Sequence, residues 1–162
     1  MFAESWSLST ERLVLRLAAS EDVPFTIRLW SDARVRVFLG GAITEEEAAR
    51  RIAARIAAAE LLVVSDRRNK QPIGALIVSE RHEQQIELAY LFAPEHWNRG
   101  YATEAIAALL GDLGSSFAGH RLFAVTQAAN TASRNLLLRL NFHEENQYTE
   151  FEELQIIYGM RL

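Results

Sequence analysis

Apolar residues near the N-terminus first recur at every second position and then at helical spacing. Leu13, Leu15 and Leu17 form the alternating segment, which predicts a half-buried strand. The acidic positions 21–22 indicate a helix start, and apolar side chains follow at positions 23, 27 and 30. The chain therefore opens with a strand followed by a helix.

A second helix is predicted after the Gly-Gly pair at 40–41. Thr44 and Glu47 have the spacing of a capping box, and one face stays apolar over the following turns. On the polar face, Glu46 and Arg50 and also Glu47 and Arg51 are expected to form ion pairs at i,i+4 spacing.

The remaining pattern predicts three strands, a long helix, a strand, a shorter helix and a closing pair of strands. Their ranges are 61–65, 72–79, 86–93, 100–117, 121–126 and 130–140, with the closing pair after residue 142. The order β, α, α, β, β, β, α, β, α, β, β indicates a mixed α/β domain rather than a strict βαβ repeat.

Length and composition limit the possible classes of protein. The chain has 162 residues, a net charge of −4, 49% hydrophobic residues and no cysteine. We expect one domain over residues 1–162, without a disulfide framework or a thiol nucleophile. The acidic balance argues against a nucleic-acid surface, and the sequence has no signal peptide or membrane-length apolar run, so a cytoplasmic protein is expected.

The segment IELAYLFAPEHWNRGYATEA, residues 86–105, carries the clearest chemical signal. A strand ends before Pro94, and a short polar loop leads to Gly100 at the start of a helix. The first N–H groups of a helix lack internal partners and attract phosphate oxygens. Gly100 and Ala102 allow close approach to the backbone, and Arg99 adds positive charge. Many such junctions bind nothing, and the fingerprints of dinucleotide-binding and P-loop proteins are absent.

HWNRGYATEA resembles the acyl-coenzyme-A loop of the GNAT superfamily of N-acetyltransferases, whose pattern is [QR]-x-x-G-x-[GA]. The match begins at Gly100, whereas Trp97 replaces the usual first residue. Tryptophan there, followed by G-Y-A-T-E-A, is typical of the RimJ/RimL-like branch. The segments 8–23 and 128–142 are similar to the opening and closing motifs of that branch, so the resemblance spans nearly the whole chain.

The resemblance implies an α/β (α+β) GNAT fold. Its mixed, mainly antiparallel central sheet would have about seven strands and about four flanking helices. Acetyl-CoA would bind where two central strands splay apart. In the motif that closes the second long helix, Asn141 replaces the usual glycine, and asparagine also tolerates the left-handed conformation that a helix end often needs.

The resemblance also assigns coenzyme-binding residues. Backbone amides of the loop would hold the pyrophosphate, the preceding strand would pair with the pantetheine arm, and Asn130 and Ser133 would lie near pantetheine. Asn130 would equally serve as a helix N-cap. The residues concerned are Tyr90, Leu91, Phe92, Ala93, Asn98, Arg99, Gly100, Tyr101, Ala102, Thr103, Asn130 and Ser133.

Two residues are catalytic candidates. Glu87 occupies the place of a family glutamate that acts as a base, directly or through water, although a solvent-facing strand glutamate would look the same. The usual acid is a tyrosine, and its position matches Leu137, so Ser133 is the candidate donor, with Tyr90 and Tyr101 as weaker ones. The four histidines show no metal-ligand spacing, and no metal is expected.

The implied function is acetyl transfer from acetyl-CoA to a primary amine, a protein N-terminus or a small molecule, by direct attack on the thioester. The alternatives are a non-catalytic acyl-CoA-binding or sensing module and, less specifically, a structural domain. The acidic residues between 144 and 153 would attract a cationic acceptor or simply form a solvated hairpin. No nucleic-acid or membrane partner is expected, and monomer and homodimer both remain open.

Overall fold

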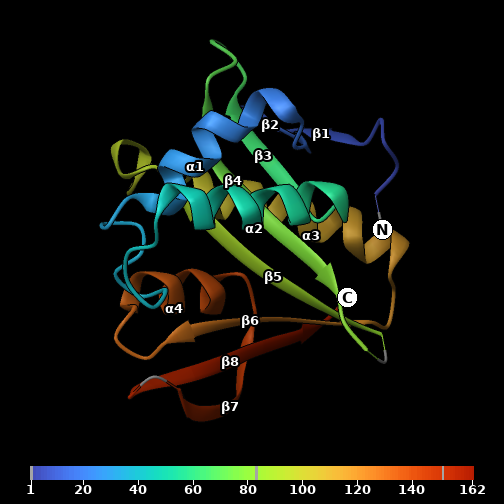
Figure 1. Cartoon of the computed structure of the whole chain (residues 1–162). Helices are drawn as coiled ribbons and strands as arrows, with labels where there is room; N and C mark the ends of the chain where they lie inside the picture. The colour runs from blue at the N-terminus through green and yellow to red at the C-terminus, as the bar shows by residue number, and fades with distance from the viewer. Residues whose placement is uncertain (1, 83, 151) are drawn as a thin grey trace.

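The computed structural model describes residues 2–82, 84–150 and 152–162. Its strands form one open sheet in the order β1-β2-β3-β4-β5-β6-β8-β7 (Figure 1). Every neighbouring pair is antiparallel except β5 and β6, which run parallel. This confirms the expected mixed and mainly antiparallel fold.

The strands are β1 (Ser7–Ser9), β2 (Leu13–Leu17), β3 (Leu61–Asp66), β4 (Pro72–Glu80), β5 (Gln85–Phe92), β6 (Arg121–Gln127), β7 (His143–Glu150) and β8 (Glu153–Arg161). The helices are α1 (Val23–Ser31), α2 (Glu45–Ala57), α3 (Tyr101–Ser116) and α4 (Thr131–Arg139), with short 3₁₀ turns η1 (Ser20–Asp22) and η2 (Pro94–His96). Over the described part of the chain, none of these helices is long and apolar enough to cross a membrane.

Helices cover both faces of the sheet, and each face has its own core. On one face, α3 contributes the fully buried Ile106, Leu109 and Leu113, and α4 contributes Leu137. On the other face, α1 and α2 pack against β3, β4 and the end of β5, with Ile52 fully buried. Figure 1 shows α1 and α2 in front of the strands and α3 behind them. The sheet is thus the middle layer of three.

The two parallel strands are paired over only three residues. Gln85, Ile86 and Glu87 of β5 lie opposite residues 121–123 of β6. Beyond Glu87, β5 stays paired with β4 as far as Phe92, and β6 stays paired with β8. The sheet therefore opens into a V between β5 and β6, as the expected splayed central strands require.

Several local predictions are confirmed by hydrogen bonds. The Thr44 hydroxyl accepts from the Glu47 N–H, Asn130 caps α4 by accepting from the Ser133 N–H, and Asn141 has the left-handed φ of +65°. The predicted ion pair of Glu46 with Arg50 is wrong, because both Arg50 and Arg51 bond to Glu47.

The sheet also has one strand more than the about seven expected. The extra strand is β1, which contributes three residues to the edge beside β2 and contains a single apolar side chain. Such a short segment shows no alternation, so its sequence does not predict a strand.

Gly74 provides a test of how tightly the centre of the sheet is packed. A Cβ at this position would lie 2.5 Å from Cδ1 of Phe92 and 2.8 Å from the Leu91 carbonyl oxygen, which cannot easily move. We expect Gly74→Ala to lower the free energy of unfolding by about 1–3 kcal/mol. The matched control is Gly111→Ala in α3, where a Cβ meets nothing within 4 Å and the gain is about 0.5–1 kcal/mol. Urea unfolding of both variants checks this, and equal stabilities would contradict it.

Candidate active site

A cavity of about 1030 Å³ lies where β5 and β6 separate. Its walls come from residues 88–92 of β5, residues 124–126 of β6 and Ile77 of β4. The loop before α3 with the first turn of that helix, α4, Trp30, residues 34–39 and Arg51 complete them. Ligand sites usually occupy a few hundred to about 1000 Å³, so this cavity can hold a coenzyme and a small acceptor together. Beyond Glu87 the facing backbone edges of β5 and β6 are not paired with each other, so they can pair with amide groups of a ligand.

The loop before α3 has a backbone shape that can accommodate an anion. Asn98 and Gly100 have left-handed φ values of +58° and +76°, and Gly100 is the N-cap residue of α3. Left-handed residues in a tight turn aim successive N–H groups toward one side, and the helix adds its own unpaired N–H groups there. Asn98, Gly100, Tyr101, Ala102 and Thr103 all line the cavity.

A cluster around Glu104 anchors this loop to the N-terminal segment. The Glu104 carboxylate accepts hydrogen bonds from the Thr10 hydroxyl at 2.5 Å, from the Arg12 N–H at 3.1 Å and from the Arg12 Nε at 2.6 Å. Arg12 also donates from Nη1 to the Arg99 carbonyl at 3.0 Å, and its guanidinium lies 4.6 Å from the centre of the Tyr101 ring. Arg12 therefore holds both ends of the turn that surrounds Gly100.

Trp97, which replaces the usual first residue of the loop motif, fixes the other end of the loop. Its Nε1–H donates to the Phe92 carbonyl oxygen at 2.7 Å. The last carbonyl of β5 is thereby satisfied from within the chain, and the loop stays close to the strand from which it emerges.

Tyr90 and Ser133 meet across the cavity. The Tyr90 hydroxyl of β5 lies 2.6 Å from the Ser133 Oγ of α4, and either atom can donate. Burial raises the pKa of Tyr90 to about 12, although the hydrogen bond with Ser133 lowers it in part. Tyr90 is therefore protonated near neutral pH, and the pair carries protons that can be donated into the cavity.

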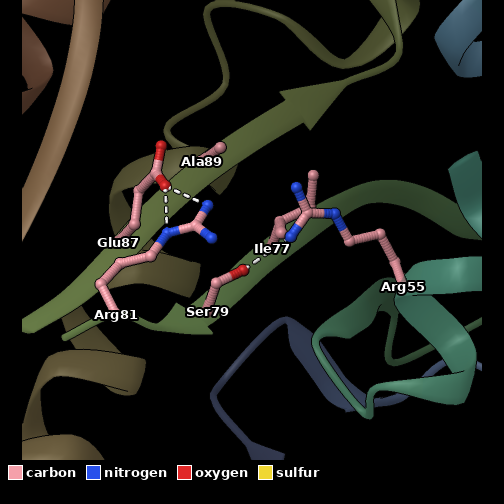
Figure 2. Close-up of a pocket in the computed structure, with 6 residues that line it drawn as sticks. All are labelled: Arg55, Ile77, Ser79, Arg81, Glu87 and Ala89. Carbon is pink, nitrogen blue, oxygen red and sulfur yellow. Dashed lines mark hydrogen bonds and ion pairs between the residues drawn. The ribbon is translucent and has the colours of Figure 1, made fainter.

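Glu87 lies at the closed end of the V, in a small pocket of about 40 Å³ that shares Ile77 and Ala89 with the large cavity. Figure 2 shows its carboxylate facing Arg81, whose Nε and Nη2 both donate to Oε2, while Arg55 reaches Ser79. Since side chains alternate along a strand, Glu87 and Ala89 lie on the α1–α2 face of β5 and Tyr90 on the α3–α4 face.

The other named residues are distributed around the cavity. Leu91, Phe92 and Asn130 line it, whereas Ala93 and Arg99 are not part of the lining. Leu137 is fully buried in the core, and its neighbour Leu136 lines the cavity instead. The α4 sequence TASRNLLLR contains no tyrosine.

The same architecture is found in known proteins. A family model described as an acetyltransferase (GNAT) domain matches residues 12–143. The chain belongs to the GNAT acetyltransferase family. It is 26% identical over 156 residues to the uncharacterized N-acetyltransferase YoaA of Bacillus subtilis (strain 168), with 89% of this chain and 86% of YoaA covered.

Solved structures agree with this GNAT fold. A GNAT-family acetyltransferase from Bacillus anthracis superposes with a TM-score of 0.86 at 21% identity, covering 96% of this chain and 98% of that one. RimL, a ribosomal L7/L12 alpha-N-protein acetyltransferase solved in complex with coenzyme A, superposes with a TM-score of 0.82 at 15% identity, covering 97% and 98%. RimL-like proteins are thus among the structural neighbours.

Sequence reasoning missed two parts of this GNAT site. The role of Thr10 and Arg12 was not predicted, although the complementary charges of the opening motif and of Glu104 offered a signal. The cavity wall formed by Trp30, residues 34–39 and Arg51 matches no sequence motif. Its only sequence signal is the apolar run in the loop after α1.

The Glu104 cluster gives a pH-dependent test. Burial alone raises the pKa of Glu104, but the hydrogen bonds from Thr10 and Arg12 outweigh it and hold the pKa below its usual 4.5. A depressed pKa in the folded state stabilises the fold above the unfolded-state value, and this contribution is lost as pH falls through the folded-state value. We expect Glu104→Gln to lower the free energy of unfolding by about 1–3 kcal/mol at neutral pH, and by progressively less below about pH 4.5.

Urea unfolding of both proteins between about pH 7 and pH 3 measures the difference. Glu11→Gln is the matched control, since Glu11 is exposed in the same turn and forms no ion pair with the described residues. A wild-type advantage over Glu104→Gln that is unchanged across this pH range would contradict the assignment.

Proposed function

We propose that this GNAT protein transfers the acetyl group of acetyl-CoA to the nitrogen of a primary amine. The observation that carries the proposal is the V between β5 and β6, which joins the start of α3 at one end to a cavity lined by Tyr90 and Ser133 at the other. Family membership supplies acetyl transfer, and the RimL neighbour, solved with coenzyme A, supports that coenzyme here.

The coenzyme is expected to use backbone groups of the chain. N–H groups at Gly100 to Thr103 would hold the pyrophosphate, because the left-handed turn and the start of α3 present them together. The free edge of β5 beyond Glu87 would pair with the amides of pantetheine, and Asn130 and Ser133 line the opposite wall.

The two proton-transfer candidates lie on opposite faces of β5, which suits direct attack. An amine arriving protonated on the α1–α2 face would give up a proton to Glu87, directly or through water, and the freed nitrogen lone pair would form a bond to the thioester carbonyl carbon. As the carbon–sulfur bond breaks, Ser133 on the other face would pass a proton to the thiolate while hydrogen-bonded to Tyr90. Solvent water entering the cavity would return a proton to Ser133, so that Tyr90 stays protonated.

Turnover separates this enzyme from a non-catalytic acyl-CoA-binding module. The chain contains no cysteine, so thiol release from acetyl-CoA can be followed with no background from the protein. We expect thiol release to depend on amine in a panel of peptides, amino acids, polyamines and aminoglycosides.

Gly100→Val, which strains a left-handed residue and blocks the loop, should weaken acetyl-CoA binding about tenfold or more by calorimetry. Tight binding without turnover of any amine would favour the sensing module.

Glu87→Gln tests the base. The glutamine keeps the size and can still accept the Arg81 hydrogen bonds, but it cannot take a proton at neutral pH. We expect turnover to fall about 10²–10⁴-fold with little change in acetyl-CoA affinity, and the loss should shrink as pH rises because more amine arrives deprotonated.

Glu145→Gln is the matched control, because Glu145 is an exposed carboxylate that pairs with Arg121 in the same way on β7, away from the cavity lining. Its turnover should equal that of the wild type. If Glu87→Gln also keeps wild-type turnover from about pH 6 to pH 9, Glu87 is not the base and catalysis relies on positioning.

A further inference from the structure

The wall of the cavity on the α1–α2 face is rich in donors and carries positive charge. Arg36 and Arg51 line the cavity there together with Arg34, whose charge is paired with Asp32, and none of the described residues in the lining is aspartate or glutamate. This differs from the expectation that acidic residues attract a cationic acceptor. The acidic hairpin residues, such as Glu144 and Glu153, are exposed and lie outside the lining.

Arg36 is a buried cation whose side chain meets no carboxylate in the described parts of the chain. Its residue surface is 7% exposed, and its Nε and Nη2 donate to the carbonyl oxygens of Gly41 and Leu39 at 2.5 Å. Burial, with the nearby charge of Arg51, lowers the pKa of Arg36. Burying a guanidinium without a counter-charge is costly, so an anion beside it would relieve that cost.

Two further groups in this wall also offer donors. Arg51 bonds to Glu47 at 2.6 Å, but Arg50 bonds to the same carboxylate, so one negative charge faces two positive ones. Trp30 is 6% exposed, and its Nε1–H has no acceptor among residues 2–82, 84–150 and 152–162. Indole and guanidinium groups donate only, so the complementary ligand must supply oxygen acceptors.

Between these donors, the same wall is apolar. Val35 and Phe38 line the cavity with Ile77 and Leu91 from the sheet. A ligand that fits this surface combines a hydrocarbon body with an anionic end, and a carboxylate matches the planar fork of an arginine in two hydrogen bonds.

We propose that the acceptor is an amine that also carries an apolar body and a carboxylate, with the carboxylate bound by Arg36 and Arg51. This inference rests on the proposed function, since it describes the second substrate of that reaction. The position of this wall supports the proposal. Val35 packs on the α1–α2 core, which lies on the face of β5 that carries Glu87. Tyr101 and Ala102, at the start of α3, pack on the opposite core.

Direct binding tests the proposal without turnover. Isocaproate is a branched apolar chain with a carboxylate, and isocaproamide is its uncharged match. With coenzyme A saturating, we expect calorimetry to show the acid binding at least about tenfold more tightly than the amide. Arg51→Gln should remove most of this preference while leaving coenzyme A affinity unchanged.

Arg50→Gln is the matched control, because Arg50 shares Glu47 but does not line the cavity. It should keep the preference for the acid. Equal binding of acid and amide to the wild type would overturn the proposal. So would an Arg51→Gln variant that loses coenzyme A affinity but keeps the preference, since the guanidinium would then serve a coenzyme phosphate. An intact preference in a protein that acetylates no amine would support the anion subsite and reject the proposed catalysis.

Discussion

The whole site depends on one constraint, which is that β5 cannot pair with β6 along its full length. Three residue pairs join the strands, and then each follows its other neighbour, β4 or β8. A sheet interior with unpaired backbone would be costly unless other groups use the space. Here Trp97 satisfies the last carbonyl of β5, and the Tyr90–Ser133 hydrogen bond spans the opening. The remaining edge is available to a ligand that itself carries amide groups.

The separation also divides the chemistry between two faces. Along β5, Glu87 and Tyr90 differ by an odd number of positions, so a single strand presents one side chain to each face. The α1–α2 face carries the buried Arg36, and the α3–α4 face carries Ser133 and the first turn of α3. One strand thereby presents side chains of different chemistry to the two sides of the same opening.

The sequence predicts well those structural features that depend on residues close together in the chain. The cap residues Thr44 and Asn130 and the left-handed Asn141 depend on a few neighbouring residues, and the strand and helix limits are correct to within about two residues, the usual uncertainty of such boundaries. The loop at Gly100 is also local, because it needs only a strand end and a helix start. Three consecutive β1 residues, in contrast, form a strand only because β2 lies beside them.

The long-range parts could not be predicted in the same way. Glu104 meets Arg12 across 92 positions, and neither residue has an unusual local pattern. The i,i+4 spacing predicts the Glu47–Arg51 pair correctly. Arg50 bonds to Glu47 rather than to Glu46, a choice that side-chain geometry makes and spacing alone does not. Arg36 looks like any loop arginine in the sequence, and only the packed structure shows that it is buried with no carboxylate beside it among the described residues.

The contact between Arg12 and the loop has a consequence for how the protein is assembled. Arg12 lies in the turn between β1 and β2 at the edge of the sheet, yet it holds a turn that is synthesised some 90 residues later. The loop therefore reaches its final shape only after most of the sheet exists. By thermodynamic linkage, a ligand that stabilises that loop would also stabilise the segment that carries Arg12. Resistance of the segment around Arg12 to proteases should therefore increase when a ligand occupies the cavity.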